Sequence, residues 1–461
     1  MHTHTVKKSP DRPSPAQLMR FFLQTLPHTA LLSLPALQEL TFYQRLFSPL
    51  VTLWYLLFQW LNHDSSLQAV LIDVQQGGAD RLNPKLSRQL TGSSTGTYSD
   101  ARTRLPEAFL TQALHLQGTK IANRSPITRW KDLIVSLLDG TTLRLRPHGD
   151  IPKEFGPHTN QHHKETYWCL MRTVVSFCCF SGAALDCAMG ALRGSEQALG
   201  CQLILRALGR RLWLGDRNFG VFRIVQTARQ VHQHVLLRMT AARAIRLRGS
   251  ALRDGDFPLL WKPTRYDKLQ PDCCPSPVPG RLIIQRLVRR GFRPQWLCLF
   301  TSLTDSAQYP AAELLELYSQ RWHIELNLRY VKAQMRAAQL EVRSAAMARK
   351  QWTACLLAYN LIRAAMLCAA LRHNLPPLTL SFSTCRRHLQ AWLSDFGCTL
   401  VEVAGSWKNM LNRLGKCQLP RRRKPRPNEP RAKRHIRESF PPLVGSRARA
   451  RRMLKKLTMK S

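Results

Sequence analysis

The sequence DLIVSLLDGTTLRL, Asp132–Leu145, has the pattern of a buried β-strand with an acid in the middle or at the end of its apolar run. Charges are costly to bury, so the Asp139 carboxylate that follows IVSLL needs a partner. RLWLGDRNFG, Arg211–Gly220, repeats the situation at Gly215-Asp216. An aspartate beside a glycine also fits an ordinary turn. The choice between a turn and a functional site depends on whether a third acid accompanies these two.

The segments around these two strands alternate between strand and helix patterns. Tyr167–Gly182 and Ala184–Leu192 predict a hairpin, and Ser195–Leu208 predicts an amphipathic helix with Ser195 as its N-cap. A helix over 222–230 and a strand over 234–240 follow. Strands mixed with helices predict an α/β fold with a mixed sheet covered on both faces.

The rest of the chain differs from this pattern. Residues 1 to about 128 predict mostly helix, and residues 241–301 hold strand-like runs, RAIRLRG among them, separated by Gly and Pro. Ala311–Met335 predicts one long helix, and Lys350–Arg372 predicts a second, apolar one. Residues 421–461 are rich in Pro and Arg, which predicts a flexible basic arm.

The third acid lies in YSQRWHIELNLRYVK, Tyr318–Lys332. At about 100° per residue, Tyr318, Arg321, Glu325 and Lys332 share one face of a helix. A solvent-exposed helix with an Arg–Glu pair at i, i+4 is one interpretation. The other is a carboxylate directed at a metal and flanked by groups that hold phosphates. Two acids on adjacent strands and one on a helix can hold two Mg²⁺ ions about 4 Å apart.

Charge indicates the partner. The 461 residues, enough for about two to four domains, include 69 Lys+Arg against 28 Asp+Glu, a formal net charge of +41. A polyanion is the natural partner for such a chain, and nucleic acid is the commonest one. A ribosome-like or membrane-surface protein that is merely basic is the alternative.

Cysteine usage and hydropathy favour a reduced, cytoplasmic setting. None of the thirteen cysteines precedes Cys169 and no CxxC pair occurs, so buried thiols are expected rather than disulfides or zinc ligands. His162 and His163 have no accompanying ligand pattern and are interpreted as loop residues. The first residues lead into no apolar signal core, and the apolar run Leu46–Asn62 predicts a buried helix rather than a membrane span.

The motifs together resemble the cut-and-paste transposases of insertion-sequence family four, in the DDE group. The family's Y-(2)-R-(3)-E-(6)-K signature matches at Tyr318, Arg321, Glu325 and Lys332, and its first two acids match at Asp139 and Asp216. The resemblance covers most of residues 35–375. It implies a ribonuclease-H-like catalytic core with a β-rich insertion, a helical N-terminal DNA-binding domain, and a helical C-terminal region with a basic tail.

The implied domain organisation has six parts. We expect a helical N-terminal DNA-binding region over 1–128, the first part of the catalytic core over 129–240, the insertion over 241–301, the core helix with the third acid over 302–345, a helical C-terminal region over 346–418 and the basic tail over 419–461.

The resemblance also implies a chemistry. Asp139, Asp216 and Glu325 would hold two Mg²⁺, with Mn²⁺ as a possible substitute, and catalyse phosphodiester hydrolysis at the inverted-repeat ends. The freed 3′-OH would attack the opposite strand and form a hairpin. The hairpin would be reopened, and the 3′-OH would then attack target DNA. The expected partner is double-stranded DNA, and no membrane partner is expected. The protein would bind the DNA as a dimer, in the cytoplasm at the nucleoid.

Further residues are expected to contact DNA. Besides the signature residues Tyr318, Arg321 and Lys332, the candidates are Trp322 and Trp296 as stacking platforms, Arg217 after the second acid, and Arg102 and Arg104 in the N-terminal region. Core packing is the alternative for Trp296. Two other functions stay open: an inactive DNA-binding protein derived from a transposase, and a ribonuclease-H-like nuclease without strand transfer.

Overall fold

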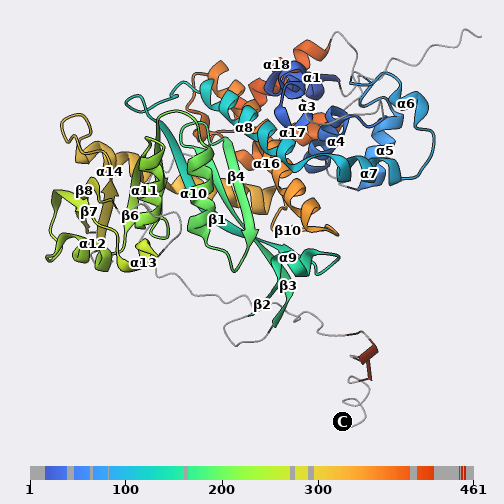
Figure 1. Cartoon of the computed structure of the whole chain (residues 1–461). Coiled ribbons are helices and arrows are strands. Elements are labelled where there is room, and N and C mark those ends of the chain that lie inside the picture. The colour runs from blue at the N-terminus through green and yellow to red at the C-terminus, as the bar shows by residue number, and fades with distance from the viewer. Residues whose placement is uncertain are drawn as a thin grey trace, which may run out of the picture.

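The computed structural model describes most of the chain (Figure 1). The described residues are 16–38, 46–62, 66–80, 82–159, 165–269, 276–288, 295–394, 402–419, 446, 448–449 and 451–452. His162, His163 and nearly all of the basic tail lie outside these ranges. The described part is a mixed α/β structure around one central sheet, which fits the expected ribonuclease-H-like core.

The sheet has ten strands in the order β2-β3-β1-β5-β6-β9-β8-β7, with β4 also paired to β3 and β10 to β1. Only the pairings β1–β5, β5–β6 and β1–β10 are parallel. The strands are β1 Ile134–Leu145, β2 Pro157–Thr159, β3 Glu165–Cys178, β4 Ala184–Ala191, β5 Arg211–Gly215, β6 His234–Met239, β7 Gly255–Trp261, β8 Val278–Leu287, β9 Gln295–Thr301 and β10 Gln339–Leu340.

The strands and helices from β1 to β6 follow the prediction closely, including the hairpin β3–β4 and the Ser195 N-cap, whose side chain accepts from the Ala198 amide. The three strands of residues 241–301 extend the same sheet, because β9 pairs with β6 and β8 joins β9 to β7. The prediction of a strand-like run at RAIRLRG is wrong. It forms helix α12, Ala241–Arg248, between the N-cap Thr240 and the left-handed Gly249.

Both faces of the sheet are covered, as predicted. Successive side chains on a strand point to opposite faces, and on β1 Leu137 and Leu138 belong to two different buried clusters. Leu137 shares its cluster with residues of the later helices α14 (Ala311–Ser319), α15 (Trp322–Arg329) and α16 (Ala345–Arg372). Leu138 shares the other cluster with residues of α10 (Glu196–Arg206) and α11 (Phe222–Gln230).

The helices before the sheet form the N-terminal region, which is helical within the described residues (Figure 1). They are α1 Ala16–Thr25, α2 His28–Leu32, α3 Pro35–Gln38, α4 Pro49–Leu61, α5 Leu67–Gln75, α6 Leu86–Gln89, α7 Gly96–Arg104 and α8 Glu107–Asn123. Helix α4 is the apolar run that was expected to be buried, and it starts at the N-cap Ser48.

The remaining helices lie within and after the sheet strands. They are α9 Ile151–Phe155, α10 Glu196–Arg206, α11 Phe222–Gln230, α12, α13 Arg265–Lys268, α14 Ala311–Ser319, α15 Trp322–Arg329, the π-helical turn η1 Tyr330–Gln334, α16 Ala345–Arg372, the 3₁₀ turn η2 Pro377–Thr379, α17 Phe382–Ser394 and α18 Glu402–Gly415.

The single long helix expected over Ala311–Met335 is wrong. The chain breaks after α14, where Gln320, Arg321, His323 and Ile324 each donate the backbone amide to the carbonyl three residues back, which tightens the turn. A second irregularity follows at η1, where the Met335 amide bonds to the Tyr330 carbonyl five residues back at 3.0 Å. The signature residues therefore lie on α14, in the turn before α15, on α15 and in the π-helical turn.

Helix α16 forms the centre of the helical part and contacts both N-terminal and C-terminal helices (Figure 1). It has the length and hydropathy of a membrane span, but 89% of its most apolar window is buried inside the molecule. Such burial is that of a core helix. The ten cysteines within the described residues are thiols, and nine of them are buried, as expected.

Candidate active site

Asp139 lies inside β1, where strand pairing changes. Its β3 side is paired, since Asp139 lies opposite Val175, but β5 ends at Gly215 opposite Leu138. The carboxylate Oδ1 accepts the Gly140 amide at 2.8 Å. Burial, together with the charge of Asp216, raises the pKa of Asp139 from 3.8 to about 7, although the Gly140 amide and Arg321 oppose the shift. The carboxyl is therefore poised between its charged and neutral forms near neutral pH.

Asp216 follows β5 directly, at the carboxyl end of that strand. Its Oδ1 accepts the Asn218 amide at 2.8 Å, which is the local turn that an aspartate before a short loop commonly makes. The Gln197 side chain of α10 donates to the Asn218 carbonyl at 3.0 Å and holds the loop from the other side. The turn interpretation and the site interpretation of Asp216 are therefore compatible.

Glu325 lies on α15, which packs beside β1. Its Oε1 accepts from Arg321 Nη2 at 2.6 Å, and the side chains are 39% and 13% exposed. The Arg321 charge also reaches Asp139, since each group perturbs the other's pKa. One guanidinium thus connects the first and third acids electrostatically.

Tyr318 and Lys332 attach the two ends of this segment to the sheet. The buried Tyr318 hydroxyl donates to the Gly215 carbonyl at 3.2 Å, next to Asp216. Lys332 Nζ donates to Thr141 Oγ1 at 3.0 Å, and Thr141 shares a sheet face with Asp139 because they are two residues apart on β1. The four signature residues therefore gather along β1 and the end of β5, although no single helix carries them.

The aromatic and basic candidates outside the signature are placed differently. Trp322 is 58% exposed on α15, and Arg217 is exposed beside Asp216. Trp296 is partly buried on β9 opposite Arg286 and packs against a core cluster. Because Cys298 pairs with Met239 at the end of β6, Trp296 lies beyond that end, toward the same sheet edge as Asp216.

Arg102 and Arg104 lie apart from the three acids, on α7. Arg104 is exposed, whereas Arg102 is half-buried, with its guanidinium 5.7 Å from the Tyr98 ring centroid. Burial lowers the pKa of Arg102. Arg102 lines a separate cavity, which is described below.

Glu196 is a fourth carboxylate that the sequence interpretation missed. It begins α10, and a Cβ on Gly140 would lie 2.1 Å from its Oε1. Gly140 points to the sheet face opposite Asp139, so Glu196 approaches β1 from that opposite face. Burial and the charge of Asp216 raise the pKa of Glu196, and Glu196 in turn raises the pKa of Asp139. A glycine after the first acid was the only local sequence signal, because only a residue without Cβ leaves this space.

The carboxylates suit a hard divalent cation chemically, since Mg²⁺ prefers oxygen ligands. Across the part of the chain that the structure describes, however, no group of three His, Cys, Asp or Glu side chains is close enough to hold a metal ion. Burial raises the pKa values of Asp139 and Glu196, and the charge of Asp216 adds to both shifts, so a bound cation would favour their ionised forms. The carboxylate oxygens of these acids fit a divalent cation chemically. In this structure the Glu325 carboxylate is paired with Arg321.

Comparison with known proteins gives the family. Residues 130–361, just over half of the chain, match the family model described as Transposase DDE domain. The chain belongs to the transposase DDE domain family. The matched DDE domain contains Asp139, Asp216 and Glu325 together with all four signature positions, and it includes the strands of residues 241–301.

Individual proteins that resemble the chain include a curated transposase and a solved transposase structure. The transposase InsG for insertion sequence element IS4 of Escherichia coli (strain K12) is 26% identical over 253 residues, which is 53% of this chain and 55% of that protein. The chain therefore matches about half the length of this relative. A structure of the piggyBac transposase synaptic complex with hairpin DNA aligns over 88% of both chains with a TM-score of 0.40 and 10% identity, values too low to support any inference.

Proposed function

We propose that the protein is a DNA transposase that binds the inverted-repeat ends of its own insertion sequence, cuts them and joins the 3′ ends to target DNA. The observation that carries the proposal is the Asp139 carboxyl. Burial and Asp216 raise its pKa to about 7 within a DDE domain. Paired acids with perturbed pKa values are typical of catalytic sites. The net charge of +41 supports DNA as the partner.

Asp139, Asp216 and Glu325 are the proposed ligands of two Mg²⁺ ions, for which Mn²⁺ can substitute. Bound cations would supply activated water and stabilise charge on the leaving oxygen. Asp139 and Asp216 already influence each other electrostatically, whereas Glu325 is paired with Arg321. Glu325 must therefore leave Arg321 to act as a ligand, which frees the guanidinium for a DNA phosphate.

The other signature residues hold and orient DNA in this proposal. Lys332 faces the same side of β1 as Asp139 and supplies a compact positive charge there. Tyr318 positions α14 against the end of β5. Trp322, exposed on α15, is the favoured stacking platform for an unpaired base during hairpin formation, and the partly buried Trp296 is the second candidate. In this proposal Arg217, which follows Asp216, contacts the DNA backbone.

The same proposal includes the domain organisation of the chain and its oligomeric state on DNA. Residues 1–128 form the DNA-binding region, 129–240 and 302–345 the catalytic core, 241–301 an insertion, 346–418 the C-terminal region and 419–461 a basic arm. Two chains pair two element ends, so the active form on DNA is a dimer that works in the cytoplasm at the nucleoid.

The experiment is an end-processing assay with the full chain, Mg²⁺ and a linear DNA that carries the flanking inverted repeats. Asp216→Asn is compared with Asp100→Asn, which makes the same change at an exposed aspartate of α7. Hairpinned ends and joined products that disappear only in Asp216→Asn support the proposal. Nicked ends without joined products would indicate a nuclease, and binding without cleavage would indicate an inactive DNA-binding protein.

A further inference from the structure

A large cavity lies between the N-terminal helices and the sheet, and none of the three acids lines it. Its volume is about 790 Å³, within the range of small-ligand sites. Its walls come from α4 and α7, from the segment between η1 and α16, and from α17. Segments far apart in the sequence therefore build one concave surface, to which the active-site chemistry assigns no role.

The cavity is strongly basic. It is lined by four arginines, Arg102, Arg336, Arg343 and Arg386, and by one acid, Glu341. Glu341 is already paired with Arg146 at 2.9 Å. The four lining arginines therefore outnumber the single lining carboxylate, which is paired with an arginine outside the lining.

Two of these arginines have unmet hydrogen-bonding capacity. Nε of Arg102 and Nε of Arg386 are buried and have no hydrogen-bond partner within the described structure. Buried donors are normally satisfied, so an orphaned one indicates a missing partner. Burial and the neighbouring charge of Arg336 lower the pKa of Arg386. An anion with several acceptor oxygens would satisfy the donors and relieve the repulsion.

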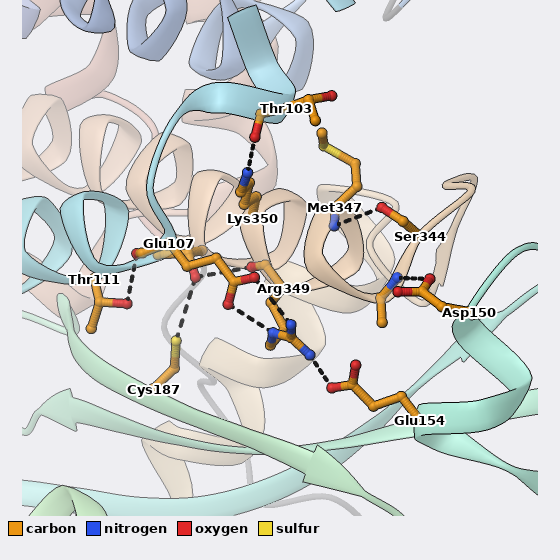
Figure 2. Close-up of polar contacts among 12 residues, drawn as sticks. Thr103, Glu107, Thr111, Asp150, Glu154, Cys187, Ser344, Met347, Arg349 and Lys350 are labelled. Atoms are coloured by element: carbon orange, nitrogen blue, oxygen red, sulfur yellow. Dashed lines mark hydrogen bonds and ion pairs between the residues drawn. The ribbon is translucent and has the colours of Figure 1, made fainter. Parts of the chain in front are cut away.

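The wall of the cavity is fixed in place at the start of α16 (Figure 2). Lys350 Nζ donates to the Thr103 carbonyl at 2.7 Å, and Arg349 bridges Glu107 at 2.7 Å and Glu154. The first amides of α16 are already taken, because Ala345 donates to Asp150 at 2.8 Å and Met347 to Ser344 at 3.2 Å. An anion in the cavity must therefore be held by side chains.

The cavity is connected to the candidate active site along β1. Leu340 lines it and pairs with Leu145, six residues after Asp139 on the same strand. Six residues of strand span about 20 Å. Since duplex DNA advances about 3.4 Å per nucleotide along one strand, a backbone that passes from Asp139 to the cavity covers about six nucleotides.

We infer that this cavity binds a DNA backbone phosphate about six nucleotides inside the end that is cut at Asp139. The inference rests on the proposed function and adds a site to it. Arg336 and Arg343 are exposed and meet the phosphate first, while the half-buried Arg102 and Arg386 complete its coordination. The contact fixes the distance between the bound DNA and the scissile bond.

The test replaces DNA phosphates one at a time by neutral methylphosphonate in an end duplex and measures affinity for the full chain. Wild type is compared with Arg336→Gln/Arg343→Gln and with Arg246→Gln, an exposed arginine of α12 outside the cavity. In wild type, a methylphosphonate about six nucleotides from the cut weakens binding about tenfold or more. In the double variant the same methylphosphonate has no further effect on affinity. In Arg246→Gln it weakens binding as it does in wild type.

Two further measurements make the outcome decisive. The double variant lowers the slope of log Kd against log salt by about 1–2, and Arg336→Lys/Arg343→Lys restores it. Equal phosphate profiles in wild type and in the Gln double variant would overturn the inference while leaving cleavage, and so the proposed function, intact. Failure of the wild type to bind end DNA would overturn both. Thermal unfolding of each variant confirms that it is folded.

Discussion

Lys332 Nζ lies 3.0 Å from Thr141 Oγ1, so the π-helical turn is joined to β1 two residues beyond Asp139. The turn widens the helix at the point where its lysine must reach the strand. π-Helical turns occur frequently at functional sites. This contact brings a cation to the face of β1 on which Asp139 lies.

Replacement of Lys332 by Met should reduce end cleavage about 10²-fold, because a positioned charge that stabilises the transition state contributes roughly this much. Thr141→Val removes the hydrogen bond and keeps the charge, so its cleavage rate should fall by less than about tenfold. Single-turnover cleavage on end DNA measures both. Equal losses in the two variants would mean that Lys332 acts through the bond to Thr141 and not through its charge.

Mg²⁺ binding should depend on pH. The raised pKa of Asp139, about 7, means that the cation competes with a proton below that value. Apparent Mg²⁺ affinity should therefore rise about fivefold from pH 6 to pH 7, reach about tenfold by pH 8 and level off above that. Calorimetric titration with Mg²⁺ between pH 6 and pH 8 measures this affinity. A pH-independent affinity, or the same profile in Asp139→Asn, would contradict the assignment.

Glu196→Gln should move that profile to lower pH. The Glu196 charge raises the pKa of Asp139, so a neutral side chain of the same shape removes the repulsion. The midpoint should fall by a measurable fraction of a pH unit while the protein remains folded. If the midpoint stays and only the plateau affinity falls, Glu196 contacts the cation instead of acting through Asp139.

The sequence predicted the strands around Asp139 and Asp216 because each of these two aspartates follows or interrupts an apolar run and lies next to a glycine. It did not predict the break after α14 or the turn η1, since YSQRWHIELNLRYVK contains neither Gly nor Pro and keeps a helical period throughout. Long-range contacts, Tyr318 to Gly215 and Lys332 to Thr141, accompany these irregularities, and no local pattern contains them.

Two other differences have different causes. The helix α12 was predictable, because Thr240 and Gly249 are ordinary start and stop signals that the strand interpretation overlooked. The position of Glu196 was not predictable, since its approach to Gly140 depends on how α10 lies over the sheet. Likewise, nothing local in YSDARTR distinguishes the half-buried Arg102 from the exposed Arg104.

Asp73→Asn should stabilise the protein at pH 7.5 by about 1–3 kcal/mol. Burial raises the pKa of Asp73 from 3.8 to about 6, so the folded state holds this proton more tightly than the unfolded chain. Stability is therefore lost as pH rises from about 4 to 6, and the neutral amide avoids that loss. The Tyr55 hydroxyl, 3.0 Å from Asp73 Oδ2, can donate to the amide oxygen as well. Urea unfolding at pH 4.5 and 7.5 should show a gain roughly three times larger at the higher pH.

Arg349→Met should lower stability by about 1–2 kcal/mol. Arg349 pairs with the partly buried Glu107 of α8 and the exposed Glu154 of α9, so its loss removes both ion pairs (Figure 2). Arg146→Met is the matched control, because it breaks the more exposed pair with Glu341 and should cost less than about 0.5 kcal/mol. Equal midpoints for the two variants in urea would show that the bridge contributes no more than a surface pair.

The central position of α16 has a consequence for synthesis. Helix α4, which ends at Leu61, packs against α16, which ends at Arg372. At about 5–20 residues per second, about 15–60 s separate the emergence of the two helices from the ribosome. During that interval the apolar side of α4 has no α16 to cover it, so we expect a chain that ends before residue 345 to leave this surface exposed and prone to aggregation.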